Sequence, residues 1–162
     1  MADLVPPEAR EMIGQVTAGP VIAEITAKES QRYAQAVDDL NPAYFDEEAA
    51  RAAGYRTLVC PPTFLDHVVV VGRSVADLRP DGLFRNPESA GIGMRRVMFG
   101  GQEWEWLAPV HVGDTVTATQ RLAGIDEKEG GKGPFALVTW ETTFTNQDGD
   151  VVARARLQGI SR

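Results

Sequence analysis

The chain has 162 residues, of which 43% are hydrophobic, and a formal charge of −7 at pH 7. Its length is that of one domain with its own core, so residues 1–162 are treated as a single domain. The acidic balance argues against nucleic acid and anionic membranes as partners, and the longest apolar run, Val68–Val71, is too short to span a bilayer.

The first half of the chain alternates one strand with several helices. Asp46 is a natural N-cap and Gly54 a natural stop for one helix, while Asn41-Pro42 ends the helix before it. The predicted elements are a short helix over 7–13, a strand over 21–26, helices over 28–38 and 46–53, and a buried helix from 64 to about 75.

The second half has the composition of a β-sheet. Residues 78–93 are rich in proline and glycine and predict an internal loop. Strand-like runs follow at 95–110, 115–125, 135–146 and 151–160, and we expect them to form a four-strand meander. One central helix wrapped by a long curved antiparallel sheet buries this pattern economically, which predicts an α+β protein of hot-dog architecture. Such a sheet leaves the edge of its first strand open for a second copy or a partner.

Cysteine and histidine usage limits the chemistry further. Cys60 is the only cysteine, which fits a reducing cytoplasm and excludes an internal disulfide. Cys60 and the two histidines, His67 and His111, show no metal-ligand spacing, so we expect no metal site and no cofactor. The N-terminus lacks the pattern of a signal peptide, and we expect a cytoplasmic protein.

Four segments carry a family resemblance over nearly the full length. They read YAQAVDDLNPAYF, AAGYRTLVCPPTF, GGQEWEWLAPVHVGDTV and TFTNQDGDVV, in this order. The chain resembles the MaoC-like hot-dog hydratases and dehydratases, and most closely their N-terminal, fatty-acid-synthase-type branch. The resemblance implies an acyl thioester of coenzyme A or acyl carrier protein as substrate. It also implies water addition to a trans-2-enoyl thioester, or the reverse elimination.

The family's catalytic motif is Asp-x-Asn-Pro-x-His, in which Asp and His share the water and Asn orients them. Here Asp39 and Asn41 match the motif, but Tyr44 stands at the histidine position. The His-Gly pair that follows in the family, whose glycine N–H holds the thioester carbonyl, is replaced by Pro61-Pro62. The resemblance therefore places one carboxylate of the site in this chain and removes two other components.

These two replacements weaken the chemistry that the motif performs. A phenol with a pKa near 10 is a poor base at neutral pH, although it can donate a hydrogen bond. Pro62 has no N–H to offer, and loss of one such donor typically costs a hundred- to thousand-fold in rate. Plain structural roles compete with the catalytic ones: Asp39 as a polar helix end, Asn41 as a turn former, which we favour, and Tyr44 as a packing residue at a dimer seam.

Other candidate substrate contacts are Pro62, Thr63, Trp104 and Arg95. Trp104 lies on the strand that lines the acyl tunnel in the family, though core packing is the favoured reading. Arg95 could meet the phosphates of a coenzyme or carrier, which two arginines on a strand indicate only weakly. His67 is expected to be an ordinary helix-face residue and His111 an exposed turn residue.

The leading interpretation is one subunit of an (R)-specific enoyl-thioester hydratase or 3-hydroxyacyl dehydratase. A second hot-dog chain would supply the complete Asp/His site. Two alternatives stay open: a self-sufficient homodimer with a variant site of Asp39, Asn41 and Tyr44, and a non-catalytic acyl-thioester binding module. A hot-dog thioesterase fits the motif segments less well.

Overall fold

One antiparallel sheet with a helix against its concave face organises the molecule. The computed structural model describes residues 4–70, 76, 78, 80, 82 and 97–162. Within these residues the strands form a five-stranded sheet in the order β1-β3-β4-β5-β2. The strands are β1 (Val16–Glu24), β2 (Val97–Trp106), β3 (Thr115–Gly130), β4 (Gly133–Thr145) and β5 (Val151–Ser161).

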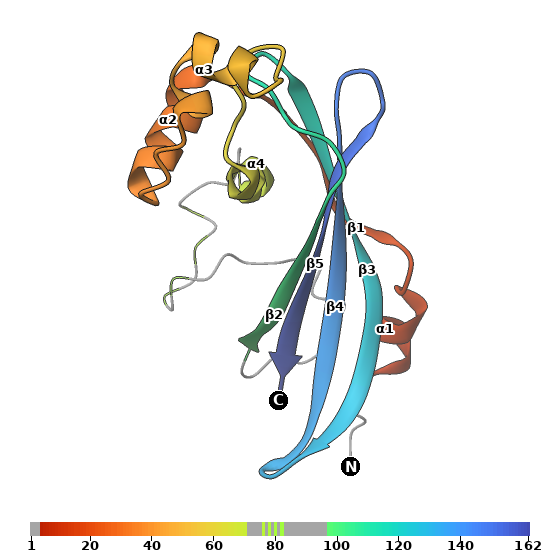
Figure 1. The fold of residues 1–162 in the computed structure, drawn as a ribbon. Helices are drawn as coiled ribbons and strands as arrows, with labels where there is room; N and C mark the ends of the chain where they lie inside the picture. Colours follow the sequence, from red (N-terminus) through yellow and green to blue (C-terminus); the bar gives the residue numbers. More distant parts are fainter. Residues whose placement is uncertain (1–3, 71–75, 77, 79, 81, 83–96) are drawn as a thin grey trace.

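The helices pack at two places along the twisted sheet. Figure 1 shows α2, α3 and α4 beside its upper part and α1 beside β3 at the lower right. α4 belongs to the cluster around Phe144, and Ala9 of α1 to the cluster around Leu122 and Trp140. Their bounds are α1 (Pro7–Glu11), α2 (Ala27–Ala36), α3 (Glu47–Ala52) and α4 (Leu65–Val70), with 3-10 turns η1 (Pro42–Tyr44) and η2 (Pro62–Phe64). This is the hot-dog arrangement that the sequence predicted. The predicted central helix is seen as η2 and α4; its continuation to residue 75 lies outside the described residues.

The acidic end of α2 has a structural explanation. The helix begins at Thr26, whose hydroxyl accepts a hydrogen bond from the Glu29 N–H at 3.3 Å. It ends with Asp38 in the left-handed region, at a φ of 57°. The Asp39 N–H then reaches back to the Ala34 carbonyl at 2.9 Å. This is the Schellman pattern of a helix end, in which Asp tolerates the position that glycine usually takes.

The next helix confirms its predicted caps. The Asp46 carboxylate accepts a hydrogen bond from the Ala49 N–H at 2.8 Å, as an N-cap does. Gly54 follows the helix with a φ of 90°, a backbone conformation that favours glycine. Local sequence signals therefore fixed both ends of α3.

Strand pairing differs from the predicted meander. β3, β4 and β5 are joined as consecutive neighbours, but β2 pairs with β5 and not with β3. The segment between β2 and β3 therefore passes β5 and β4 to connect the edge strand β2 with β3. β1 is an edge strand, as predicted, and it begins at Val16 because bulges let the pairing continue past Gly19-Pro20.

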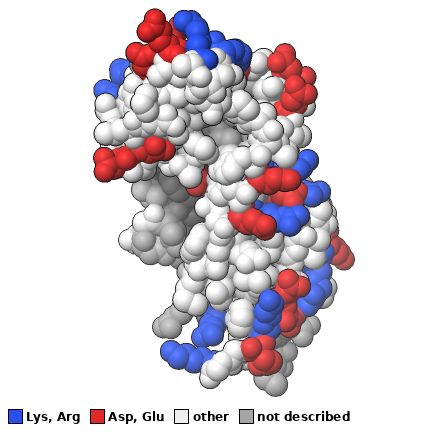
Figure 2. Space-filling view, in the orientation of Figure 1, with Lys and Arg blue, Asp and Glu red and all other residues white. Residues whose placement is uncertain are grey.

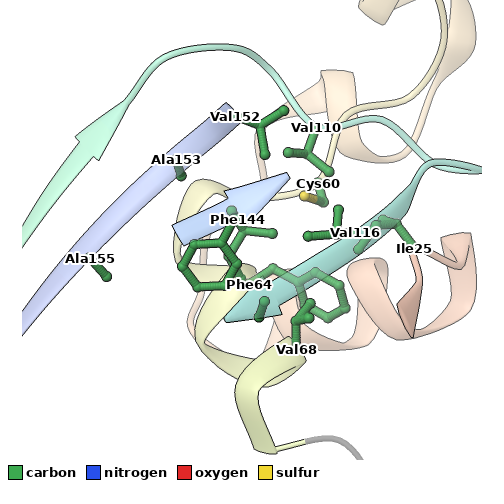
Figure 3. Packing of buried hydrophobic residues seen from close by; sticks show 12 residues of the cluster. Ile25, Cys60, Phe64, Val68, Val110, Val116, Phe144, Val152, Ala153 and Ala155 are labelled. Carbon is green, nitrogen blue, oxygen red and sulfur yellow. The ribbon is translucent and has the colours of Figure 1, made fainter. Parts of the chain in front are cut away.

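The core lies between α4 and the concave face of the sheet. Phe64, Val68 and Phe144 belong to one buried cluster, and Phe144 is fully buried. Figure 3 shows the two phenyl rings among aliphatic side chains from several strands, with Cys60 close by. Phe64, Leu65 and Val68 of the predicted central helix thus bury their side chains in this cluster, and such burial is the main source of stability in a layered fold.

The outer face of the sheet carries a row of charges. Arg121, Glu141 and Arg156 are cross-strand neighbours on β3, β4 and β5. The Glu141 side chain is only 8% exposed and accepts hydrogen bonds from both guanidinium groups. Figure 2 shows positive and negative side chains interspersed along the right-hand side of the molecule. Burial alone would raise the pKa of Glu141, but the hydrogen bonds from Arg156 and Arg121 outweigh it and lower that pKa.

This arrangement predicts acid-sensitive stability. A carboxyl group with a lowered pKa in the folded state stabilises the fold above its unfolded pKa and loses that contribution as the pH falls through the folded value. Glu141→Gln is expected to cost about 2 kcal/mol at pH 7, since hydrogen bonds to charged groups contribute roughly that much. The variant should also lose less stability than the wild type below about pH 4. Urea unfolding between pH 7 and pH 3 measures both effects, and parallel pH profiles for the two proteins would contradict the assignment.

Candidate functional site

Tyr44 lies at the centre of the motif segment and is held by its neighbours. It ends η1 and is 6% exposed, in a small buried cluster with Ala34, Ala43 and Val59. The Gln31 side chain donates to the Tyr44 carbonyl at 3.2 Å, and the Val59 N–H donates to the Ala43 carbonyl at 3.3 Å. Helix α2 and the chain after α3 thus fix the tyrosine from two sides.

The tyrosine hydroxyl contacts the motif carboxylate. Tyr44 Oη donates a hydrogen bond to Asp39 Oδ2 at 3.2 Å. Burial, and then the neighbouring Asp39 charge, raise the pKa of Tyr44 to about 12. The phenol therefore keeps its proton at neutral pH and cannot accept one from water. The structure brings these two predicted residues together through this hydrogen bond.

Asn41 lies next to this pair and forms the turn. Its side-chain oxygen accepts a hydrogen bond from the Ala43 N–H at 3.0 Å and so caps η1. The turn-forming role favoured from the sequence is the one that its contacts display. Asn41 also lines a pocket beside Tyr44.

A pocket of about 340 Å³ opens beside Tyr44. Its lining includes Pro62 at the start of η2, and Asp39 is not among its lining residues. The remaining walls are mainly apolar and aromatic: Tyr55, Val59, Cys60, Leu65, Trp106, Leu107, Ala108, Pro109 and Val110. Pro62 thus lines the pocket without offering an N–H, while Asp39 is outside the lining and contacts Tyr44, which belongs to it.

Two antiparallel segments build one wall of the pocket. The Cys60 N–H donates to the Val110 carbonyl at 2.9 Å, and Val59 and His111 form a β-bridge. Burial raises the pKa of the Cys60 thiol to about 12, so the thiol in this wall stays protonated. The wall is therefore a neutral surface at physiological pH.

Polar contacts behind this wall explain why His111 is not exposed as predicted. His111 is 8% exposed, and its backbone N–H donates to the Asp114 carboxylate at 2.8 Å. The same carboxylate accepts hydrogen bonds from Arg56 and from the Gln147 side chain. Burial, and then the Arg56 charge, lower the pKa of His111. Through Asp114, these contacts connect the turn at 111–114 to Arg56 and Gln147. The sequence pattern alone did not indicate these connections.

The other predicted substrate contacts are dispersed. Thr63 is exposed and does not line the pocket, and Arg95 lies outside the described residues. Trp104 packs against the core cluster, while Trp106, two residues later on the same face, lines the pocket. The alternation of the segment correctly placed both indoles on one face. Trp106 could have been preferred to Trp104 as a pocket residue because it ends β2, next to residues 107–110, which also line the pocket.

In the described part of the chain, no group of three or more His, Cys, Asp or Glu side chains is arranged to hold a metal ion. No helix among these residues is long and apolar enough to cross a bilayer. The pocket beside Tyr44 is the candidate site because the motif residues Asn41, Tyr44 and Pro62 line it.

This arrangement can bind an apolar group but has an incomplete set of catalytic groups. Water addition to an enoyl thioester needs a base for the water, a proton for Cα and donors for the enolate oxygen. Tyr44 is protonated and already donates to Asp39. Pro62 offers no donor at the helix start that faces the pocket. The described site thus lacks both a base exposed in the pocket and the donor at position 62.

Comparison with known proteins places these features in a family. A family model described as "FAS1-like, dehydratase domain region" matches residues 11–155. A UPF0336 protein of Parafrankia sp. (strain EAN1pec) is 31% identical over 156 residues, which cover 96% of this chain and 95% of that protein.

Solved structures show the same fold. A chain of the HadBC (3R-hydroxyacyl-ACP dehydratase) complex from Mycobacterium tuberculosis superposes with a TM-score of 0.69 at 25% identity, covering 93% of this chain and 97% of that one. A chain of the ChsH1-ChsH2 complex from the same organism gives 0.76 at 19% identity, with 96% of each chain covered. Both neighbours are described as complexes of two named components.

Proposed function

Because this chain belongs to the FAS1-like dehydratase region family, with a MaoC-like hot-dog fold, we propose that it is one subunit of an (R)-specific enoyl-thioester hydratase or 3-hydroxyacyl-thioester dehydratase. In this proposal a second hot-dog chain carries the complete Asp/His pair and performs the chemistry. This chain contributes its pocket and stabilises the assembly. The substrate is an acyl thioester of coenzyme A or of acyl carrier protein.

The observation that carries the proposal is the contact between Tyr44 and Asp39. A buried phenol that donates to the carboxylate occupies the place where the family has a histidine base. Its raised pKa removes the base, and Pro62 removes the carbonyl donor. Two groups of the reaction are therefore missing from one chain, and a partner with the intact motif would supply both.

The exposed edge of the sheet supports pairing with another hot-dog chain. β2 is an edge strand, and Met98 and Phe99 on it are 46% and 71% exposed. Trp106 and Leu107, at its end, are 42% and 46% exposed. Large apolar side chains along an unpaired strand edge are an aggregation hazard unless another chain covers them. A partner on this edge would also lie beside the pocket, since Trp106 and Leu107 line it.

The proposal is tested by comparing the motif Asp of the partner chain with Asp39 of this chain in a complex of the two proteins. The chain is co-expressed with a hot-dog protein that carries Asp-x-Asn-Pro-x-His and His-Gly, and the reading frame next to its own gene is the first source to try. Hydration of crotonyl-CoA is followed by the loss of enoyl-thioester absorbance. Replacing the motif Asp of the partner with Ala is expected to lower kcat by about a hundredfold or more.

Asp39→Ala in this chain is the matched variant. It is expected to change the kcat of the complex by no more than a few-fold, because Asp39 lies outside the pocket lining. A hundredfold loss from Asp39→Ala would instead indicate a self-sufficient variant site. Binding of acyl-CoA without turnover in any pairing would indicate a binding module. Either result would overturn the proposal.

A further inference from the structure

An indole ring forms part of the wall of the pocket beside Tyr44. Trp106 lines the pocket, whereas Trp104 and Phe144 do not. The Trp104 and Trp106 rings are stacked, with centroids 4.5 Å apart and planes 6° apart. Trp104 in turn stacks on Phe144 at 5.4 Å and 23°. Three rings thus run in sequence from the fully buried core to the pocket wall.

Small residues on the neighbouring strand make room for this stack. Trp106 is paired across β2 and β5 with Ala153, and Ala153 is paired across β4 with Phe144. Trp104 is paired with Ala155 in the same way. Both alanines are buried. A larger side chain at either position would occupy the space over β5 across which the indoles reach the core, so the stack is held in one arrangement.

The lining suits an apolar occupant of limited length. None of the described residues that line the pocket is Lys, Arg, Asp or Glu. At roughly 30 Å³ for each water-sized group, a volume of about 340 Å³ holds on the order of ten non-hydrogen atoms. On the side of the core, the stacked rings of Trp106 and Trp104 lie between this space and Phe144.

We propose that Trp106 sets the length of the acyl group that this chain accepts. The pocket volume gives a limit of about eight carbons for that group. This inference rests on the proposed function, because it takes the pocket to hold the acyl part of a thioester. Trp106 is then a specificity-determining residue and has no role in proton transfer. In this proposal the indole face limits the pocket, and stacking on Trp104, which stacks on Phe144, holds the Trp106 ring in place.

The test measures where affinity stops rising with chain length. Saturated acyl-CoAs from butanoyl to hexadecanoyl are titrated by calorimetry into the full chain, alone and in the complex described above. Each buried methylene is expected to raise affinity about fourfold until the chain meets Trp106. For the wild type the rise in affinity should end at about eight carbons. For Trp106→Ala it should end at about twelve, because the removed indole leaves room for several methylenes.

Two further variants make the result specific. Trp106→Phe keeps a ring at the wall and should shift the end point by less than Trp106→Ala. Phe99→Ala removes an exposed ring of the same strand that does not line the pocket, and in the isolated chain its end point should equal that of the wild type. The end point does not depend on overall affinity, so modest destabilisation by a variant leaves it readable.

The outcomes separate the two proposals. If the wild type and Trp106→Ala bind acyl-CoAs with the same end point, the role of Trp106 is overturned while the proposed function stands. If no acyl-CoA of any length binds to the chain or to the complex, the proposed function fails, and the Trp106 inference fails with it.

Discussion

Replacing Phe144 with alanine is expected to destabilise the chain by about 4 kcal/mol, the usual cost of emptying a buried phenylalanine site. Phe144 is fully buried, lies in the cluster that joins α4 to the sheet, and supports Trp104 by stacking. The variant loses the burial of the ring and leaves a cavity that the paired strands cannot close. Urea unfolding followed by circular dichroism gives the difference in free energy.

Phe99→Ala is the matched control for this prediction. Phe99 is 71% exposed on the edge strand, so its removal is expected to change the stability of the isolated chain by about 0.5 kcal/mol or less. Equal losses in the two variants would mean that the core does not lie between α4 and β4. A small loss in both would mean the same.

Restoring the missing groups is expected to create activity in the isolated chain. Tyr44→His places an imidazole, which can act as a base at neutral pH, beside Asp39. Pro62→Gly returns a backbone N–H at the helix start that faces the pocket. Because one such donor contributes a hundred- to thousand-fold in rate, the double variant should hydrate crotonyl-CoA at least about a hundredfold faster than the wild-type chain.

The single variants and a control show whether the two groups act together. Each single change should give a smaller gain than the double variant, since the base and the enolate donor serve the same step. Tyr44→Phe removes the hydroxyl that donates to Asp39 but adds no base, and it should give no gain. A wild-type chain as fast as the double variant would contradict the assignment of Tyr44 and Pro62 as the missing components.

Local signals in the sequence predicted local structure well. Asp46 and Gly54 marked both ends of α3, because a carboxylate N-cap and a glycine with positive φ act through bonds to nearby backbone. The turn between β3 and β4 was also predicted from its glycines, since β3 ends at Gly130 and β4 begins at Gly133. Thr26 and Glu29, which begin α2, formed a capping pair that the sequence reading did not use.

Non-local arrangement was harder to predict. The alternating pattern of β2 shows which side chains share a face, but it does not specify the neighbouring strand, and β2 pairs with β5. The burial of His111 depends on Asp114 and on the bridge to Val59, which come together only in the fold. The motif predicted that Asp39, Asn41 and Tyr44 would be close. It did not indicate that the Tyr44 hydroxyl donates to Asp39, because that contact depends on how the side chains are oriented in the fold.

The rate of crotonyl-CoA hydration by the purified wild-type chain, with no other hot-dog protein present, tests the central claim most directly. We expect a rate indistinguishable from the buffer blank, because a phenol with a raised pKa at position 44 and a proline at position 62 leave the reaction without a base and a donor. Turnover at about 1 s⁻¹ or faster, in the range of ordinary enzymes, that disappears in Asp39→Ala would contradict it.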